Sequence, residues 1–116
     1  MPSLLLSRRD LDFLLYEWLD VELLTKRVRF ADHSRETFDA VLELSEQIAT
    51  RHFAPHNKKA DAQEPTFDGE RVTMIPEVAE ALKVFADAGL TGSNLDYEVG
   101  GMQLPSTVSS ACFAWF

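Results

Sequence analysis

The sequence predicts an all-α protein, a small bundle of amphipathic helices with one short stretch that could pair as a β-hairpin. Three observations lead to this prediction. Apolar residues recur at helical spacing over most of the chain. Serine, proline and glycine stand at the positions where these helical patterns begin and end. A single Asp-Gly pair at 68–69 supplies a tight-turn signal between two short apolar runs.

The first helical pattern is "RDLDFLLYEWLDVELL", residues 9–24. Ser7 or Asp10 can cap its start. Phe13 widens the apolar surface, so we expect this helix to touch something on more than one side. The basic stretch "KRVRFADH" that follows breaks the pattern and is predicted to be a loop. One face of the helix carries apolar side chains at i, i+3, i+4, i+7 and i+8, namely Leu11, Leu14, Leu15, Trp18 and Leu19.

The longest helical pattern covers residues 34–63. Ser34 is a plausible N-cap, and Glu36 in the first turn suits the helix dipole. Pro55 removes a backbone donor, so we expect a kink there in preference to a helix end. The apolar stripe of this helix comprises Phe38, Val41, Leu42, Ser45, Ile48, Ala49, His52 and Phe53.

The stretch after this helix changes character. Asp68-Gly69 favours a two-residue turn, and Phe67 on one side with Val72 and Met74 on the other could flank it as a hairpin. An isolated pair of strands would need support from the helices.

A third helix is predicted over 76–88. Pro76 suits its first position and Gly89 the residue past its end. We expect its buried face to comprise Val78, Leu82, Phe85 and Ala86.

The loop "LTGSNLDYEVGGMQ", residues 90–103, leads into the last helix, which Leu104-Pro105 opens. Gly100-Gly101 lets the backbone adopt positive φ or pass close to a bulky group. Two interpretations of this loop stay open. It could be a functional loop, since functional residues concentrate on loops, or it could be a simple connector between helices, since most turns are only turns.

Length and composition limit the functions to consider. A chain of 116 residues fits one small domain. Its net charge of −8 argues against binding to nucleic acid or to an anionic membrane surface, since both need a cationic face. No stretch is apolar for long enough to span a bilayer. Cys112 is the only cysteine, so an intrachain disulfide is excluded and a cytoplasmic location is expected.

Few residues offer site chemistry. His52 and His56 have the i, i+4 spacing of metal ligands, but a zinc site needs a third ligand, so we expect no metal site. His33 precedes a helix cap and is expected to be solvated. Cys112 has apolar neighbours in sequence and is predicted to be a buried, inert thiol. No catalytic constellation or nucleotide-binding motif stands out, and we assign no catalytic residue.

Four stretches in order resemble the N-terminal region of acyl-CoA dehydrogenases, closest to the long branch typified by 3-methylmercaptopropionyl-CoA dehydrogenase. They are "RRDLDFLLYEWLDVELLT", "FADHSRETFDAVLELSEQIATRHFAPHNKKAD", "FDGERVTMIPEVAEALKVFADAGLTG" and "DYEVGGMQLPSTVSSACFAWF". The glycine pair and Leu104-Pro105 match the family's loop, whereas Val99 replaces the aromatic residue that usually precedes the glycines. The resemblance implies an arm and first helix over 1–30 and the N-terminal helical domain over 31–116, truncated within its last helix.

The resemblance also implies a function. Members of the family bind FAD and oxidise an acyl-CoA thioester to the trans-2-enoyl-CoA, passing electrons to an electron-transfer flavoprotein. The flavin lies mainly between the middle and C-terminal domains, and the C-terminal domain carries the catalytic glutamate. A chain of this kind would be inactive alone and would not be expected to bind FAD. It would supply part of the acyl-cavity wall, through Leu95, Tyr97, Gly100, Gly101 and Leu104.

The terminus "STVSSACFAWF" ends on two aromatic residues, Trp115 and Phe116. We expect these two residues, with Val108 and Cys112, to be core or interface positions whose partners lie beyond residue 116. The alternative interpretation is a stand-alone helical dimerisation or interaction module, in which the terminus and Phe13 form a self-association surface. A homo-oligomer is expected in either case.

Overall fold

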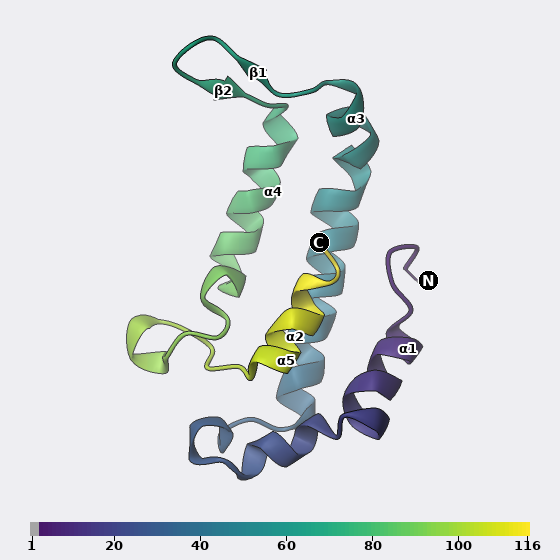
Figure 1. Ribbon diagram of the computed structural model, residues 1–116, viewed down its shortest axis with the longest axis vertical. Coiled ribbons are helices and arrows are strands. Elements are labelled where there is room, and N and C mark those ends of the chain that lie inside the picture. The colour runs from purple at the N-terminus through teal and green to yellow at the C-terminus, as the bar shows by residue number, and fades with distance from the viewer. Residues whose placement is uncertain (1–2) are drawn as a thin grey trace.

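The computed structural model describes residues 3–116 and is organised around one long helical path. Helix α2 (Arg35–Ile48) continues through a π-helical turn (Ala49–Phe53) and a 3-10 turn (Ala54–His56) into α3 (Asn57–Ala62). Helices α4 (Pro76–Asp87), α5 (Ser106–Phe113) and α1 (Arg8–Asp12) are arranged around this path (Figure 1). The predicted class is confirmed: the chain is mostly helical, with a single two-stranded sheet in the described residues.

The N-terminal segment is less regular than predicted. Ser7 caps α1, which passes directly into a π-helix (Phe13–Trp18), and 3-10 turns follow at Val21–Lys26 and Val28–Phe30. The wider π-helical turn changes which side chains face inward. Leu15 and Tyr16 are buried, as is Val21. The predicted face is therefore wrong in part, because Leu14, Trp18 and Leu19 are exposed.

Helix α2 agrees closely with its prediction. Ser34 is the N-cap, and it forms a capping box with Thr37. The predicted stripe is buried from Phe38 to Ala49, but His52 is exposed and does not belong to the core. The helical path is irregular around Pro55, where it passes through a π-helical and a 3-10 turn, but it continues beyond Pro55 into α3.

The hairpin forms at the far end of α3 and α4 (Figure 1). Strands β1 (Thr66–Phe67) and β2 (Val72–Thr73) are antiparallel, with Phe67 opposite Val72. The loop between them, residues 68–71, has four residues, where the Asp-Gly signal predicted two. All four strand residues are exposed.

Helix α4 begins at Pro76, and Gly89 beyond its end has φ +81°, both as predicted. Its inward face differs from the prediction. Ala81 is buried and Phe85 is half-buried, whereas Leu82 and Ala86 are exposed. The inward face of α4 is therefore shifted by about one residue around the helix.

The core lies between α2 and α5, with the N-terminal segment and α4 on either side of them (Figure 1). Val108, Cys112 and Trp115 are buried within this chain, and Phe116 packs on Phe53 and Phe85. The expectation that these terminal positions depend on partners beyond residue 116 is therefore wrong. No helix within residues 3–116 combines the length and apolarity needed to cross a bilayer. The largest buried side chains of the core include Phe38, Leu42 and Val108.

Candidate functional site

An open apolar groove of about 510 Å³ separates the first half of α2 from the loop before α5. One wall belongs to α2 and the other to residues 97–104. No Asp, Glu, Lys or Arg side chain lines the groove, and most of its surface is hydrocarbon. Its nine lining residues are His33, Thr37, Ala40, Val41, Leu44, Tyr97, Gly101, Met102 and Leu104.

The α2 wall follows from helical periodicity. Thr37, Ala40, Val41 and Leu44 are spaced i, i+3, i+4 and i+7, so they share one face of the helix. This face lies beside the buried stripe, and Val41 belongs to both. The helix therefore buries one stripe in the core and leaves a second, weaker stripe to line the groove. Sequence reasoning missed Ala40 and Leu44, although their i, i+4 spacing beside the main stripe was a usable signal.

Two glycines shape the opposite wall, each in a different way. Gly100 has φ +85°, and its position has open space around it. Gly101 is in close contact with the backbone of Leu95, and a Cβ at Gly101 would collide with the Leu95 carbonyl. Both properties that the glycine pair predicted, positive φ and close approach, are therefore present, one at each residue.

Hydrogen bonds hold this loop against the segment before α2. Arg29 Nη1 lies 2.6 Å from Asp96 Oδ1, and Gln103 Nε2 donates to the Arg29 carbonyl at 2.8 Å. Gln103 Oε1 accepts from the Tyr97 backbone N–H at 3.2 Å. Within the loop, Gly101 N–H donates to Asp96 and Gln103 N–H to Leu95, both at 2.9 Å. These hydrogen bonds and the ion pair hold the loop wall of the groove in place before any ligand binds.

His33 connects the two walls of the groove. Its Nε2 lies 2.9 Å from the Met102 carbonyl oxygen and 3.1 Å from that of Gln103. Carbonyl oxygens only accept, so Nε2 carries the proton and donates. Its Nδ1 lies 3.1 Å from the Thr37 hydroxyl, and the Tyr97 hydroxyl lies 3.3 Å from Nε2. The prediction that His33 is merely solvated is wrong, because the ring is half-buried and bridges helix and loop.

The structure brings together three of the five predicted wall residues: Tyr97, Gly101 and Leu104. Leu95 and Gly100 do not line the groove. The Leu95 side chain is exposed, and the Leu95 backbone packs closely against Gly101. Gly100 provides the turn. The sequence thus singled out three residues of the loop that lines this groove, but it did not identify the α2 wall or His33.

The chemistry available in the groove is that of an apolar binding surface. The uncharged lining suits a hydrocarbon chain, and the volume lies within the range of small-molecule pockets. The same lining does not fit a flavin dinucleotide. No cationic side chain faces the groove, and the His33 nitrogens already have partners, so a pyrophosphate would find no positive charge there.

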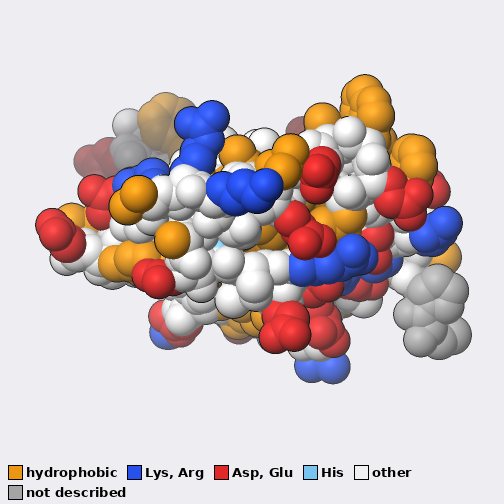
Figure 2. All heavy atoms as spheres, turned by 90° about the horizontal axis from the view of Figure 1, so that it is seen from below, with side chains coloured by type: hydrophobic (Ala, Val, Ile, Leu, Met, Phe, Trp, Pro, Cys, Tyr) orange, Lys and Arg blue, Asp and Glu red, His pale blue; other side chains and the backbone are white. Residues whose placement is uncertain are grey.

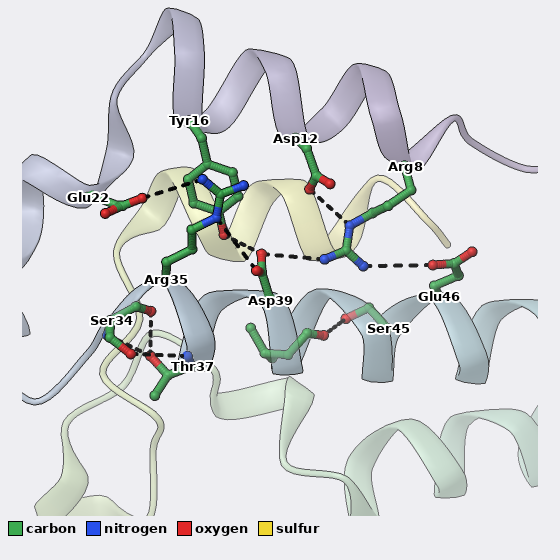
Figure 3. Close-up of polar contacts among 11 residues, drawn as sticks. Arg8, Asp12, Tyr16, Glu22, Ser34, Arg35, Thr37, Asp39, Ser45 and Glu46 are labelled. Carbon is green, nitrogen blue, oxygen red and sulfur yellow. Dashed lines mark hydrogen bonds and ion pairs between the residues drawn. The ribbon is translucent and has the colours of Figure 1, made fainter.

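A polar cluster fixes the N-terminal segment to α2 (Figure 3). Arg8 Nε donates to Asp12 at 3.0 Å, and its Nη2 reaches Asp39 on α2 at 3.5 Å. Arg8 Nη1 lies 3.8 Å from Glu46, also on α2. One guanidinium therefore joins the two helices along two turns of α2.

Tyr16 extends this cluster. Its hydroxyl donates to Asp39 Oδ1 at 2.6 Å, and the Arg35 guanidinium lies 3.9 Å from its ring centroid (Figure 3). Burial raises the pKa of Tyr16 above its ordinary value, and the hydrogen bond to Asp39 raises it further. Arg35 also lies 3.7 Å from Glu22. Each exposed ion pair contributes little to stability, so we assign the cluster a role in orientation.

The remaining candidates from the sequence, His52, His56 and Cys112, lie outside the groove. His52 and His56 border a second pocket that also contains Lys59 and Glu77. Within residues 3–116, no three His, Cys, Asp or Glu side chains are placed so that they could hold a metal ion together. Burial raises the pKa of the Cys112 thiol, in agreement with the predicted inert cysteine.

The apolar groove is therefore the candidate site that the structure defines best. The chain matches no protein-family model, no curated protein and no solved structure.

Proposed function

We propose that this chain is the N-terminal helical part of an FAD-dependent acyl-CoA dehydrogenase, and that its groove forms part of the wall around the acyl chain. The observation that carries the proposal is the position of Tyr97, Gly101 and Leu104. These residues belong to the loop that resembles the family motif, and they line an apolar, uncharged groove against α2. An acyl chain needs such a wall, because burying methylene groups is its main source of binding free energy.

In this proposal the chain performs no chemical step. The catalytic base, most of the flavin site and the contact with an electron-transfer flavoprotein belong to the other domains that the resemblance implies. The contribution of this chain is to offer the acyl chain an apolar, preformed wall. His33 and the Arg29–Asp96 pair keep that wall in place by fixing the loop.

The test uses the product of the complete reading frame that contains this chain. We expect that protein to carry flavin, visible by its absorbance, and to reduce an artificial electron acceptor when acyl-CoA is added. A colourless product without this activity would refute the proposal.

Two matched variants then test the groove itself. Ala40 lies in the groove and Ala79 lies on the exposed surface of α4, and both are exposed helical alanines. We expect Ala40→Phe to raise KM for long acyl-CoA about tenfold, equivalent to roughly 1.4 kcal/mol, and to leave short acyl-CoA unaffected. Ala79→Phe should change neither. An active enzyme that is indifferent to Ala40→Phe would show that the groove does not hold the acyl chain.

A second candidate function is a helical interaction module. The C-terminal aromatic residues do not support it, because Trp115 is buried within the chain. Phe13 does support it, since this side chain and its neighbours on the N-terminal segment remain exposed.

A further inference from the structure

The apolar groove contains a hydrogen-bond donor that the protein itself does not use, the hydroxyl of Tyr97. His33 Nε2 faces two carbonyl oxygens and therefore carries a proton, so the Tyr97 oxygen, 3.3 Å away, can only accept from it. Within residues 3–116 the Tyr97 hydroxyl donates to no protein acceptor. Its proton is therefore available to an oxygen atom of a ligand.

The other donors of the groove lining are occupied. The Thr37 hydroxyl gives its proton either to the Ser34 carbonyl oxygen at 2.9 Å or to His33 Nδ1 at 3.1 Å, so it has an acceptor in both cases. The backbone N–H groups of the α2 wall belong to the helix and its capping box, and those of the loop wall donate to other loop residues. A mostly apolar site with few polar groups is typical for small ligands, and the polar groups fix the orientation of the ligand.

This free donor lies at one end of the groove. The Tyr97 hydroxyl lies next to His33, which precedes α2, whereas Leu44 lies seven residues after Thr37 on the helix. At 1.5 Å per residue, Thr37 and Leu44 are about 10.5 Å apart along the helix axis. The groove therefore has a polar end at the start of α2 and an apolar end at Leu44.

This length corresponds to a chain of about eight carbons. With bonds of about 1.5 Å and angles of about 111°, an extended hydrocarbon advances about 1.25 Å per carbon. Full burial of one methylene group raises affinity about fourfold. The groove is open on one side and covers roughly half of each methylene, so we expect a gain of about twofold per carbon.

The charges of the chain favour a neutral ligand. No Asp, Glu, Lys or Arg side chain lines the groove, so neither a carboxylate nor an ammonium group would find an ionic partner there. The net charge of −8 further opposes an anion. By contrast, Figure 2 views the molecule from the end that carries the N-terminal segment and shows exposed hydrophobic side chains there beside acidic and basic ones.

We propose that the groove holds one straight, uncharged chain of about eight carbons, with an oxygen acceptor at the Tyr97 hydroxyl and the hydrocarbon along α2 toward Leu44. This inference rests on the proposed function in taking an acyl group as the natural occupant, and it adds the length and direction of that occupant. Flavin and turnover of the complete protein decide the proposed function, whereas binding to this chain alone decides the inference. Straight 1-alkanols are suitable probes, because each carries one oxygen acceptor on an unbranched chain.

Titration of the isotope-labelled chain with 1-alkanols of four to ten carbons, followed by amide chemical shifts, tests the length. We expect the shifts to centre on the groove, with an affinity that rises about twofold per carbon and levels off near eight carbons. Ala40→Phe fills the groove and should abolish binding, whereas Ala79→Phe on the exposed surface of α4 should not change it. Absence of binding, an affinity that still rises at ten carbons, or an equal loss in both variants would overturn the proposal.

Substitutions at the two ends of the groove test the direction. Tyr97→Phe removes the free proton but keeps the ring, so it should weaken alkanols of every length by the same factor, about fivefold for one hydrogen bond. Leu44→Ala should weaken only alkanols of about seven carbons or more. Leu82→Ala is the matched control, because Leu82 is an exposed leucine of α4 outside the groove. If Leu44→Ala weakens 1-butanol as much as 1-octanol, or Tyr97→Phe weakens neither, the proposed orientation is wrong. Circular dichroism checks that the helices of each variant are intact.

Discussion

Gly101 shows how a single backbone position determines the shape of the groove wall. A methyl group there would collide with the Leu95 carbonyl, and backbone atoms cannot move aside easily. We expect Gly101→Ala to destabilise the chain by about 1–3 kcal/mol, the usual cost of overpacking. Gly100→Ala is the control, because it strains φ but meets no neighbouring atom, and it should cost roughly 1 kcal/mol. Urea unfolding of both variants measures the difference, and equal losses would contradict this account.

Tyr16 is a second single residue with a global effect, because it makes the free energy of unfolding depend on pH. Its pKa is raised by burial and then by Asp39, so its contribution to stability is fully present below the ordinary tyrosine pKa of about 10. That contribution is lost as the pH rises from there toward the higher pKa of the folded state. Tyr16→Phe also removes the 2.6 Å bond to Asp39 and should cost about 1 kcal/mol at pH 7.

The measurement is urea unfolding at neutral and alkaline pH. The wild type should lose stability above about pH 10 more steeply than Tyr16→Phe does, since only the wild type must ionise this buried phenol. Tyr97→Phe serves as the comparison, because Tyr97 is 44% exposed at the groove. Parallel pH profiles for wild type and Tyr16→Phe would show that Tyr16 titrates as an ordinary tyrosine.

At the scale of elements, the side chain of Asp68 supports the turn of the hairpin. Asp68 accepts from the backbone N–H groups of Glu70 at 2.8 Å and Arg71 at 2.7 Å, and these bonds lower its pKa. The carboxylate therefore supports the turn at every pH above the ordinary aspartate pKa of about 3.9. This support is lost as the pH falls through the lowered value.

Amide chemical shifts of Glu70 and Arg71 report this titration directly. We expect both to move together with a midpoint below about pH 3.9, and to stay constant in Asp68→Asn. The asparagine oxygen can still accept, so the hairpin should persist in that variant without its pH dependence. A midpoint at the ordinary value would mean that the turn forms without the carboxylate.

The same scale shows where sequence patterns predict structure and where they fail. The capped start of α2 and its stripe from Phe38 to Ala49 were predictable, because Ser34 and a regular 3.6-residue period agree. The buried face of the N-terminal segment was not predictable, because a π-helix changes the spacing of inward-facing residues and no single residue marks where the π-helix starts. In α4, Leu82 remains exposed while the smaller Ala81 is buried. Periodicity indicates that a helix has an apolar side, but packing against its neighbours decides which residues are covered.

The groove illustrates the same limit across elements. Tyr97, Gly101 and Leu104 could be selected from the sequence, since a glycine pair before Leu-Pro marks an unusual loop. His33 could not, because its role depends on meeting the Met102 carbonyl, 69 positions later in the chain. Contacts of this range follow from the arrangement of the helices, which local patterns do not specify.

For the molecule as a whole, the C-terminus closes the core. The Phe116 ring packs edge-on against Phe53 at 5.0 Å and Phe85 at 4.9 Å between centroids, joining the helical path beyond α2 to α4. Phe113, three residues earlier, is 69% exposed. Two phenylalanines close in sequence therefore have opposite environments, which provides a matched comparison.

We expect Phe116→Ala to lower the free energy of unfolding by about 1–3 kcal/mol, because two aromatic pairs of about 0.5–1.5 kcal/mol each are lost. Phe113→Ala should change it by less than about 0.5 kcal/mol, as is usual for exposed positions. If α2, α4 and α5 form one cooperative unit, the urea midpoint of Phe116→Ala should fall while the slope m stays constant. A lower m or a second transition would show that α4 unfolds separately once the ring is removed. Phe116 would then connect two separately unfolding units instead of completing one cooperative unit.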